Sequence, residues 1–182
     1  KSLKLLLQSK EYTVQWRLLT NSGQDSSFIR PIFGSGGWPH YPGSSMKGAF
    51  RQACQELAKR DDSLTSNTCD FYCGSENDNA PKPGILRFYG GYPASINWKK
   101  SQLLDIVHPQ QPWQVQITDN KKENSPSALI SLHQQKIVFI ISSDQDTVDW
   151  DEVWKIWGYA LSKGIGSLVS AGYGQFKETT EE

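Results

Sequence analysis

The stretch at residues 42–51 joins a long glycine-rich loop to a helix. The loop covers residues 21–41 and contains four glycines. After it, apolar side chains recur at i, i+3, i+4 and i+7, the spacing of an amphipathic helix. These side chains are Met46, Ala49, Phe50, Ala53, Cys54, Leu57 and Ala58. The pattern predicts a helix at about residues 45–60, with Ser44 or Ser45 as its N-cap, because a serine oxygen can accept from the free amides of the first turn.

Two basic side chains, Lys47 and Arg51, stand four residues apart at the start of this helix. The first turn carries the positive end of the helix dipole, and like charges at i, i+4 repel, so this placement is unfavourable in an isolated helix. An anion bound at the helix start would remove the conflict, because serine hydroxyls, free amides and both cations would converge on it. The alternative is a solvated basic face on an ordinary helix.

Three segments resemble the RAMP superfamily, the RNA-binding subunits of type III CRISPR effector complexes. The first is Pro-Gly-Ser-Ser-Met-Lys-Gly-Ala-Phe-Arg at residues 42–51, which is similar to the signature of that family. The second is the glycine-rich run at residues 164–176, where Gln175 takes a position that is often basic in the family. Residues 84–88 and 104–109 resemble, more loosely, the small end-of-filament subunit of Cmr-type complexes.

The resemblance implies a subunit of a CRISPR ribonucleoprotein that binds CRISPR RNA and target RNA through backbone contacts. Its protein partners would be other RAMP subunits and the large subunit of the complex, and binding would need no cofactor. Phosphates would meet the basic residues, the serines and the glycine-rich loop, and bases would stack on tyrosines. The residues expected to contact RNA are Arg30, His40, Tyr41, Ser44, Ser45, Lys47, Arg51, Lys163, Gly166, Ser167, Ser170, Gly172 and Tyr173.

Two other functions remain open from the sequence. Some RAMP subunits cut RNA with an aspartate in the loop before the signature helix, and Asp25 is the only candidate in this loop. Such an enzyme would be a metal-dependent endoribonuclease using Mg²⁺ or Mn²⁺, although a single carboxylate is a poor metal site for phosphoryl transfer. The third possibility is a structural assembly subunit that makes no RNA contact.

The order of predicted elements favours an α+β, ferredoxin-like βαββαβ fold with two helices on one face of an antiparallel sheet. Apolar and β-branched runs predict strands at residues 12–19, 85–89, 103–108, 113–118, 128–133, 136–141 and 173–177. A second helix at residues 149–163 would begin with a capping box at Asp149 and Glu152, bury a tryptophan stripe and end at Gly164. Residues 1–182 would form one domain, with polar loop insertions near 61–83 and 119–127.

Composition limits the possible partners. The formal net charge is zero, so an RNA contact must use a local patch rather than a globally basic surface. No apolar run approaches transmembrane length, and we expect no membrane partner. The three cysteines lack the spacing of a disulfide framework, which favours free thiols in the cytoplasm. A zinc site using Cys69, Cys73 and a distant histidine is the alternative.

Overall fold

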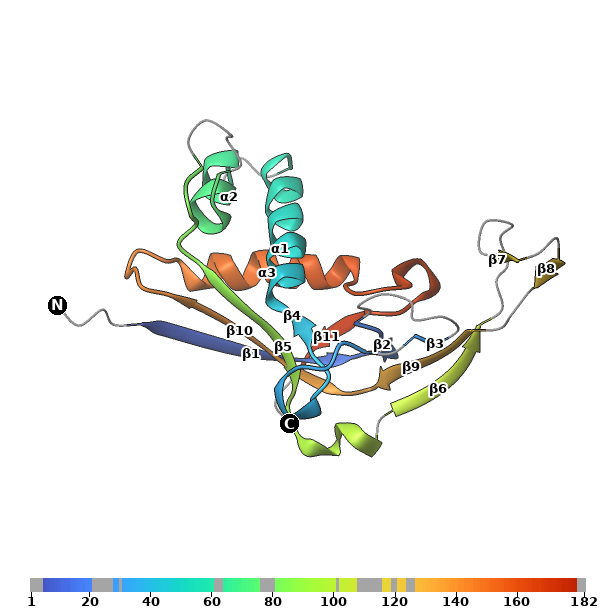
Figure 1. The fold of residues 1–182 in the computed structure, drawn as a ribbon. Coiled ribbons are helices and arrows are strands. Elements are labelled where there is room, and N and C mark those ends of the chain that lie inside the picture. The colour runs from blue at the N-terminus through green and yellow to red at the C-terminus, as the bar shows by residue number, and fades with distance from the viewer. Residues whose placement is uncertain are drawn as a thin grey trace.

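A five-stranded antiparallel sheet with helices on one face forms the centre of the molecule (Figure 1). The computed structural model describes residues 5–20, 28–29, 31–60, 64–75, 81–100, 102–107, 116–118, 121–123 and 127–179. The strands are β1 (Leu6–Val14), β2 (Arg17–Leu18), β3 (Phe28–Ile29), β4 (Tyr41–Pro42), β5 (Arg87–Pro93), β6 (Gln102–Val107), β7 (Gln116–Thr118), β8 (Lys121–Glu123), β9 (Ser127–His133), β10 (Lys136–Ser143) and β11 (Phe176–Glu178). The α-helices are α1 (Gly43–Ala58), α2 (Ser66–Cys73) and α3 (Trp150–Lys163), and three short 3₁₀ segments lie at Ser35–Gly37, Ile96–Lys100 and Val169–Ala171.

The main sheet has the order β11-β1-β10-β5-β4, and every neighbouring pair in it is antiparallel. Four strands of the main sheet and the two long helices follow one another along the chain as β1, α1, β5, β10, α3 and β11, with the other elements between them. This order is a βαββαβ unit, and β1 and β10 are its central strands. Both α1 and α3 lie over the same face of this sheet (Figure 1). The prediction of an α+β, ferredoxin-like fold is therefore confirmed.

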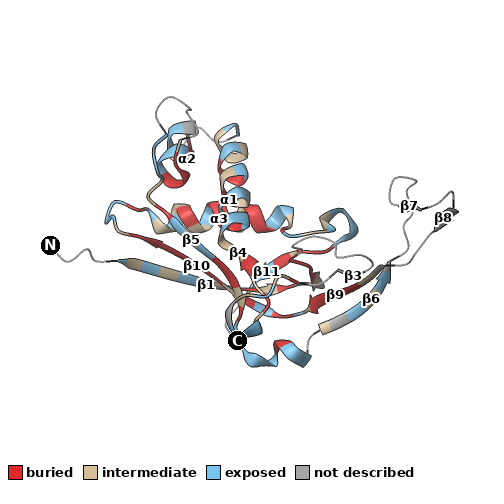
Figure 2. Ribbon diagram, viewed as in Figure 1, coloured by how far each residue is buried: buried red, intermediate tan, exposed pale blue. Residues whose placement is uncertain are grey.

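The core forms between the sheet and these two helices (Figure 2). Alternate residues of β10 are buried there, because successive strand side chains point to opposite faces. Phe139 lies at the centre, with its ring 4.9 Å from the ring of Trp157 and 6.1 Å from that of Tyr12. Trp157, which belongs to the predicted tryptophan stripe of α3, is fully buried and therefore part of the core.

The two predicted helices occur, but the start of α1 differs from the prediction. The N-cap is Pro42 rather than a serine, and no side chain caps the helix. Pro42 is held in an extended conformation because it pairs with Gly90 of β5, so the helix begins directly at Gly43. The helix α3 begins at the predicted position, with Asp149 accepting a hydrogen bond from the Glu152 amide, but only this half of the predicted capping box forms. The Glu152 carboxylate accepts from the Tyr72 hydroxyl, at 2.6 Å.

A second sheet continues from the first at a corner. It contains β2-β9-β3, with β6 also paired to β9, and it extends away from the helices (Figure 1). The predicted strand at residues 12–19 is broken at this corner, since β1 ends at Val14 and β2 begins at Arg17. Beside it, β9 and β10 do not form a hairpin, because the turn at Gln134 (φ +46°) carries the chain from one sheet to the other.

The predicted polar insertion at residues 61–83 contains the helix α2. Thr65 and Thr68 form a reciprocal capping box at its start, a signal that the sequence interpretation overlooked. Cys69 of α2 is bonded to Cys54 of α1 in a disulfide, with a Cα–Cα distance of 5.7 Å. The prediction of three free thiols is therefore wrong for two of them, and only Cys73 is free.

Several strand boundaries also move. The strand β5 continues to Pro93, beyond the predicted end at residue 89, because it pairs along β10. The last strand begins at Phe176 rather than at residue 173. The expected polar excursion after residue 118 includes β8, which pairs with β7. None of the helices in the described part of the chain combines the length and the apolar character needed to cross a membrane.

Candidate nucleic-acid interface

The two glycine-bearing motifs meet at one cleft of about 160 Å³. Its lining residues are Thr20, Ile32, Tyr41, Pro42, Ser45, Gly166 and Ser167. Tyr41, Pro42 and Ser45 come from the segment that enters α1, whereas Gly166 and Ser167 come from the loop after α3. The volume is well below the roughly 300 Å³ of a typical small-molecule pocket. The cleft is therefore suited to a small polar group rather than to a whole nucleotide.

Close backbone packing fixes the α1 side of the cleft. β4 pairs with β5 through Tyr41 opposite Gly91 and Pro42 opposite Gly90. A Cβ atom on Gly43 would collide with the Phe88 carbonyl, and one on Gly90 would collide with the Tyr41 carbonyl. Glycine at both positions lets the start of α1 lie against the backbone of β5. The first-turn amides, which have no partner inside a helix, receive no side-chain cap here.

The loop side of the cleft is held mainly by its own backbone. The Ser167 amide donates to the Leu19 carbonyl at 2.9 Å, and the Ile165 amide donates to Gly174 at 3.0 Å. The Gly174 amide in turn donates to the Arg17 carbonyl at 2.7 Å. These amides are therefore used inside the protein, which corrects the expectation that the loop amides are generally available to a phosphate. The lining also carries four hydroxyls, those of Thr20, Tyr41, Ser45 and Ser167. The Thr20 hydroxyl accepts from the Ile32 amide, and the Tyr41 hydroxyl donates to the Ser45 carbonyl.

None of the four predicted phosphate-binding cations lines the cleft among the described residues. Arg51 donates to the carbonyls of Cys73 and Gly74, at 3.1 and 2.8 Å, and so stabilises the carboxyl end of α2. Lys163 lies 3.5 Å from the Glu56 carboxylate and over the Tyr159 ring. Lys47 is exposed on the first turns of α1. Arg30 lies outside the described residues.

The two predicted stacking tyrosines are buried, so their ring faces are not open to a base in this structure. Tyr41 is 6% exposed, its ring packs edge-on against Phe139, and burial raises the pKa of its hydroxyl to about 12. Tyr173 is 4% exposed, and burial raises its pKa as well. His40 is half-buried and stacks on Tyr92, with ring centroids 5.5 Å apart.

The remaining predicted RNA-contacting residues differ in exposure. Ser44, Ser170 and Gly172 are exposed, but they are not lining residues of the cleft. The candidate catalytic residue Asp25 lies outside the described residues. Within the described ranges, no three His, Cys, Asp or Glu side chains are close enough to share a metal ion. The proposed zinc ligand Cys69 is in the disulfide, and Cys73 is buried, which raises its pKa to about 11.

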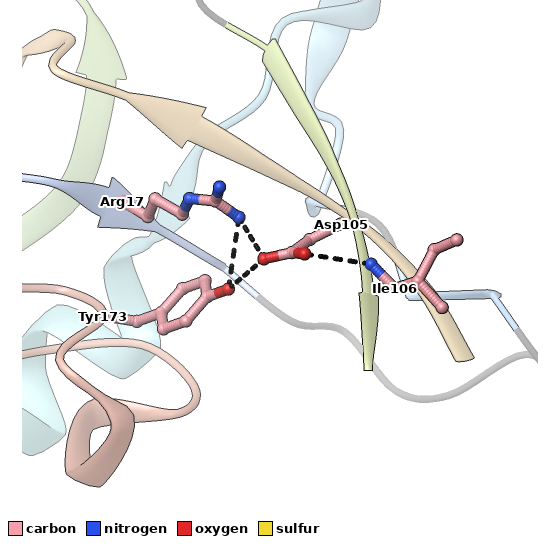
Figure 3. A network of polar contacts seen from close by, with 4 residues as sticks. All are labelled: Arg17, Asp105, Ile106 and Tyr173. Carbon is pink, nitrogen blue, oxygen red and sulfur yellow. Dashed lines mark hydrogen bonds and ion pairs between the residues drawn. The ribbon is translucent and has the colours of Figure 1, made fainter. Parts of the chain in front are cut away.

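A polar network beside the cleft was not found from the sequence (Figure 3). Arg17 on β2 forms an ion pair with Asp105 on β6, 88 residues later, and the Tyr173 hydroxyl donates to the same carboxylate at 3.2 Å. This network ties the corner between the sheets to the glycine-rich loop. Only the polar interruption at Gln15 to Arg17 in an otherwise strand-like run could have indicated the corner. Nothing in the sequence pattern points to Asp105 as the partner.

Several solved structures share this fold. A chain of the Type III-B Cmr-beta bound to cognate target RNA matches with a TM-score of 0.74 and 20% identity, covering 100% of this chain and 61% of that one. Cmr6 from Pyrococcus furiosus matches with a TM-score of 0.58 and 17% identity, covering 97% of this chain and 99% of that one. A chain of a Type IV-B CRISPR complex has a TM-score of 0.62 and 16% identity, covering 96% and 90%.

These similarities establish a shared fold along the whole chain, which spans about three-fifths of the Cmr-beta neighbour (61%). No protein-family model matches the sequence, and no curated protein matches it significantly. The fold and the site together define an α+β, ferredoxin-like domain with a small hydroxyl-lined cleft between two glycine-bearing motifs.

Proposed function

We propose that this chain is a RAMP-type subunit of a type III CRISPR ribonucleoprotein and binds RNA through its sugar–phosphate backbone. The observation that carries the proposal is the meeting of the two glycine-bearing motifs at one cleft, although they are separated by more than a hundred residues in the chain. Each motif resembles the RAMP superfamily by sequence. The similarity in fold to CRISPR-complex chains, one of them from a complex with target RNA, supports the same class.

A single phosphate suits the dimensions and chemistry of the cleft. Its volume of about 160 Å³ is several times the roughly 10–15 Å³ that one water molecule needs, enough for a phosphate and a few waters. The hydroxyls of Ser45 and Ser167 would donate to phosphate oxygens from opposite walls, and the uncapped start of α1 adds the positive end of a helix dipole. Such contacts hold the backbone without reading sequence.

The resemblance to the RAMP superfamily also implies protein partners for this chain. We propose that it contacts guide RNA or the guide–target duplex on one surface and neighbouring RAMP subunits or the large subunit on another, within a cytoplasmic complex. Binding would need no cofactor. A net charge of zero suits a chain that contacts RNA on one surface and protein on another, because a strongly basic surface would also bind RNA nonspecifically.

The test is single-stranded RNA binding, followed by fluorescence anisotropy at several salt concentrations. Ser45→Glu should weaken binding by about tenfold, because a carboxylate in the cleft repels a phosphate. The same change should leave the fold intact or slightly more stable, since an acidic side chain is favoured in the first turn of a helix. Ser9→Glu is the matched control, because Ser9 is exposed on β1 and outside the cleft. Equal affinity of both variants and the parent would overturn the cleft as the RNA site.

A further inference from the structure

An exposed tryptophan stands at the corner between the two sheets, beside the glycine-rich loop. Trp16 is 43% exposed, an unusual position for the largest apolar side chain. It lies between β1 and β2, and the Gln134 amide donates to its carbonyl at 3.1 Å. The backbone at this position is thus held in place by the turn between β9 and β10.

Neighbouring side chains also hold the indole in place. The guanidinium carbon of Arg17 lies 4.9 Å from the indole centroid, within cation–π range. The Tyr173 ring approaches edge-on, with centroids 5.1 Å apart. Both neighbours are bound to Asp105, so the indole rests on the polar network shown in Figure 3. A fixed, partly exposed ring loses little conformational entropy when a flat ligand stacks on it.

We propose that Trp16 is a stacking subsite for an unpaired RNA base. This inference rests on the proposed function and extends it from the phosphate backbone to one base. Aromatic side chains bind unpaired bases through their π faces, with little dependence on base identity. The exposed part of the indole is the surface that such a base would cover.

The position of Trp16 relative to the cleft supports an RNA base as the ligand. Thr20 lines the cleft and is four residues after Trp16, so their Cα atoms lie within roughly 14 Å of each other along an extended chain. The glycine-rich loop spans the same interval, from Ser167 at the cleft to Gly172, where an added Cβ would lie 3.7 Å from the indole. One strand of RNA with a phosphate in the cleft would therefore have a neighbouring base within reach of the indole.

A single aromatic residue elsewhere provides a matched control. Phe71 on α2 is 44% exposed, close to the 43% of Trp16, but it lies on the helical side of the main sheet (Figure 1). The experiment compares Trp16→Ala, Trp16→Phe and Phe71→Ala with the parent in anisotropy titrations of single-stranded oligouridine and oligoadenine. Each titration is repeated at several salt concentrations, and thermal unfolding of each variant is measured in parallel.

Loss of a stacked base should weaken binding of both oligonucleotides by about tenfold in Trp16→Ala, following measured stacking contributions. Trp16→Phe should retain most of the affinity, and Phe71→Ala all of it. The slope of affinity against salt should stay the same in all variants, because stacking releases no counterions. If Trp16→Phe folds like the parent and binds as weakly as Trp16→Ala, the loss is not one of stacking and the inference is wrong.

Three other results would also overturn the inference. If the parent binds RNA and Trp16→Ala binds equally well, the subsite is wrong while the cleft proposal stands. If Trp16→Ala loses association with a partner subunit but not with RNA, the indole is a protein contact. Failure of the parent to bind RNA at any salt concentration would overturn the proposed function together with this subsite.

Discussion

The helix-covered side of the main sheet and the corner beneath the glycine-rich loop are stabilised by different interactions. The first is a continuous apolar core in which Phe139, Trp157 and Phe50 are fully buried. The corner has, among the described residues, a separate cluster of three buried side chains next to the ion pair of Arg17 and Asp105. These side chains are Leu19, Leu129 and Tyr173. Apolar burial therefore carries the stability of the fold, whereas directional polar contacts fix the shape of the proposed RNA-binding surface.

The largest effect should come from emptying the core. Trp157→Ala removes a fully buried ring that packs 4.9 Å from Phe139, and it should lower the free energy of unfolding by about 4 kcal/mol. Chemical denaturation followed by circular dichroism measures the loss. A loss no greater than that caused by changes at the corner would contradict the division between the two regions.

The disulfide between α1 and α2 should have the next largest effect, still on the helical side. A crosslink between residues 15 apart in sequence stabilises a protein by about 3 kcal/mol in the chain-entropy account. Adding reductant should lower the stability of the parent by roughly this amount and leave Cys54→Ser unchanged. Cys73→Ser is the control, since Cys73 is the free thiol and this variant should respond to reductant like the parent. A parent that is insensitive to reductant would indicate that the pair is not oxidised in solution.

Alkaline pH should distinguish Tyr41, which is buried in the main core, from Tyr173 at the corner. Burial raises the pKa of Tyr41 to about 12, so its contribution is present below the ordinary value of about 10 and is lost as pH rises through about 12. The loss should be roughly 2 kcal/mol, because the unfolded chain releases its proton first. Tyr41→Phe should flatten this part of the pH–stability curve. Tyr173→Phe should flatten the curve less, because the neighbouring Arg17 opposes the burial that raises the pKa of Tyr173.

Breaking the ion pair at the corner should have the smallest effect on stability. Asp105→Asn removes the charge opposite Arg17 while keeping the shape of the side chain, and it should cost about 1 kcal/mol because the carboxylate is partly exposed. Asp144→Asn, which breaks the exposed pair with Arg87, is the control and should cost less. Hydrogen exchange at the amides of the glycine-rich loop should rise in Asp105→Asn only. If hydrogen exchange at these loop amides is unchanged in Asp105→Asn, the polar network does not hold the loop in place.

The sequence predicted the helical side better than the corner, for a physical reason. Helical and strand periodicity report which face of an element is buried, and they located α1, α3 and the central strand β10. The α2 helix was overlooked because it is short and lies in a polar stretch, although its capping box is visible in the sequence. Strand pairing between distant segments has no such local signal, so the break between β1 and β2 and the second sheet were not predicted.

The sequence indicated where the candidate site lies better than it indicated the role of each side chain in the site. Residues 42–45 and 166–167, which belong to the two motifs that the sequence interpretation singled out, lie together at the cleft. Side-chain roles were less predictable, because they depend on which neighbours satisfy each group. Arg51 is bound to the end of α2, and Tyr41 is buried against Phe139, so neither is available as the local pattern suggested.

The central claim is that RNA lies across the cleft between the two glycine-bearing motifs, and photocrosslinking tests it most directly. Single-stranded RNA containing 4-thiouridine is bound to the unmodified protein and irradiated, and the crosslinked peptides are identified by mass spectrometry. The account predicts crosslinks within residues 41–47 and 164–173, together with Trp16. Crosslinks confined to other surfaces, such as the aromatic residues Tyr89 and Tyr92 on β5, would contradict it.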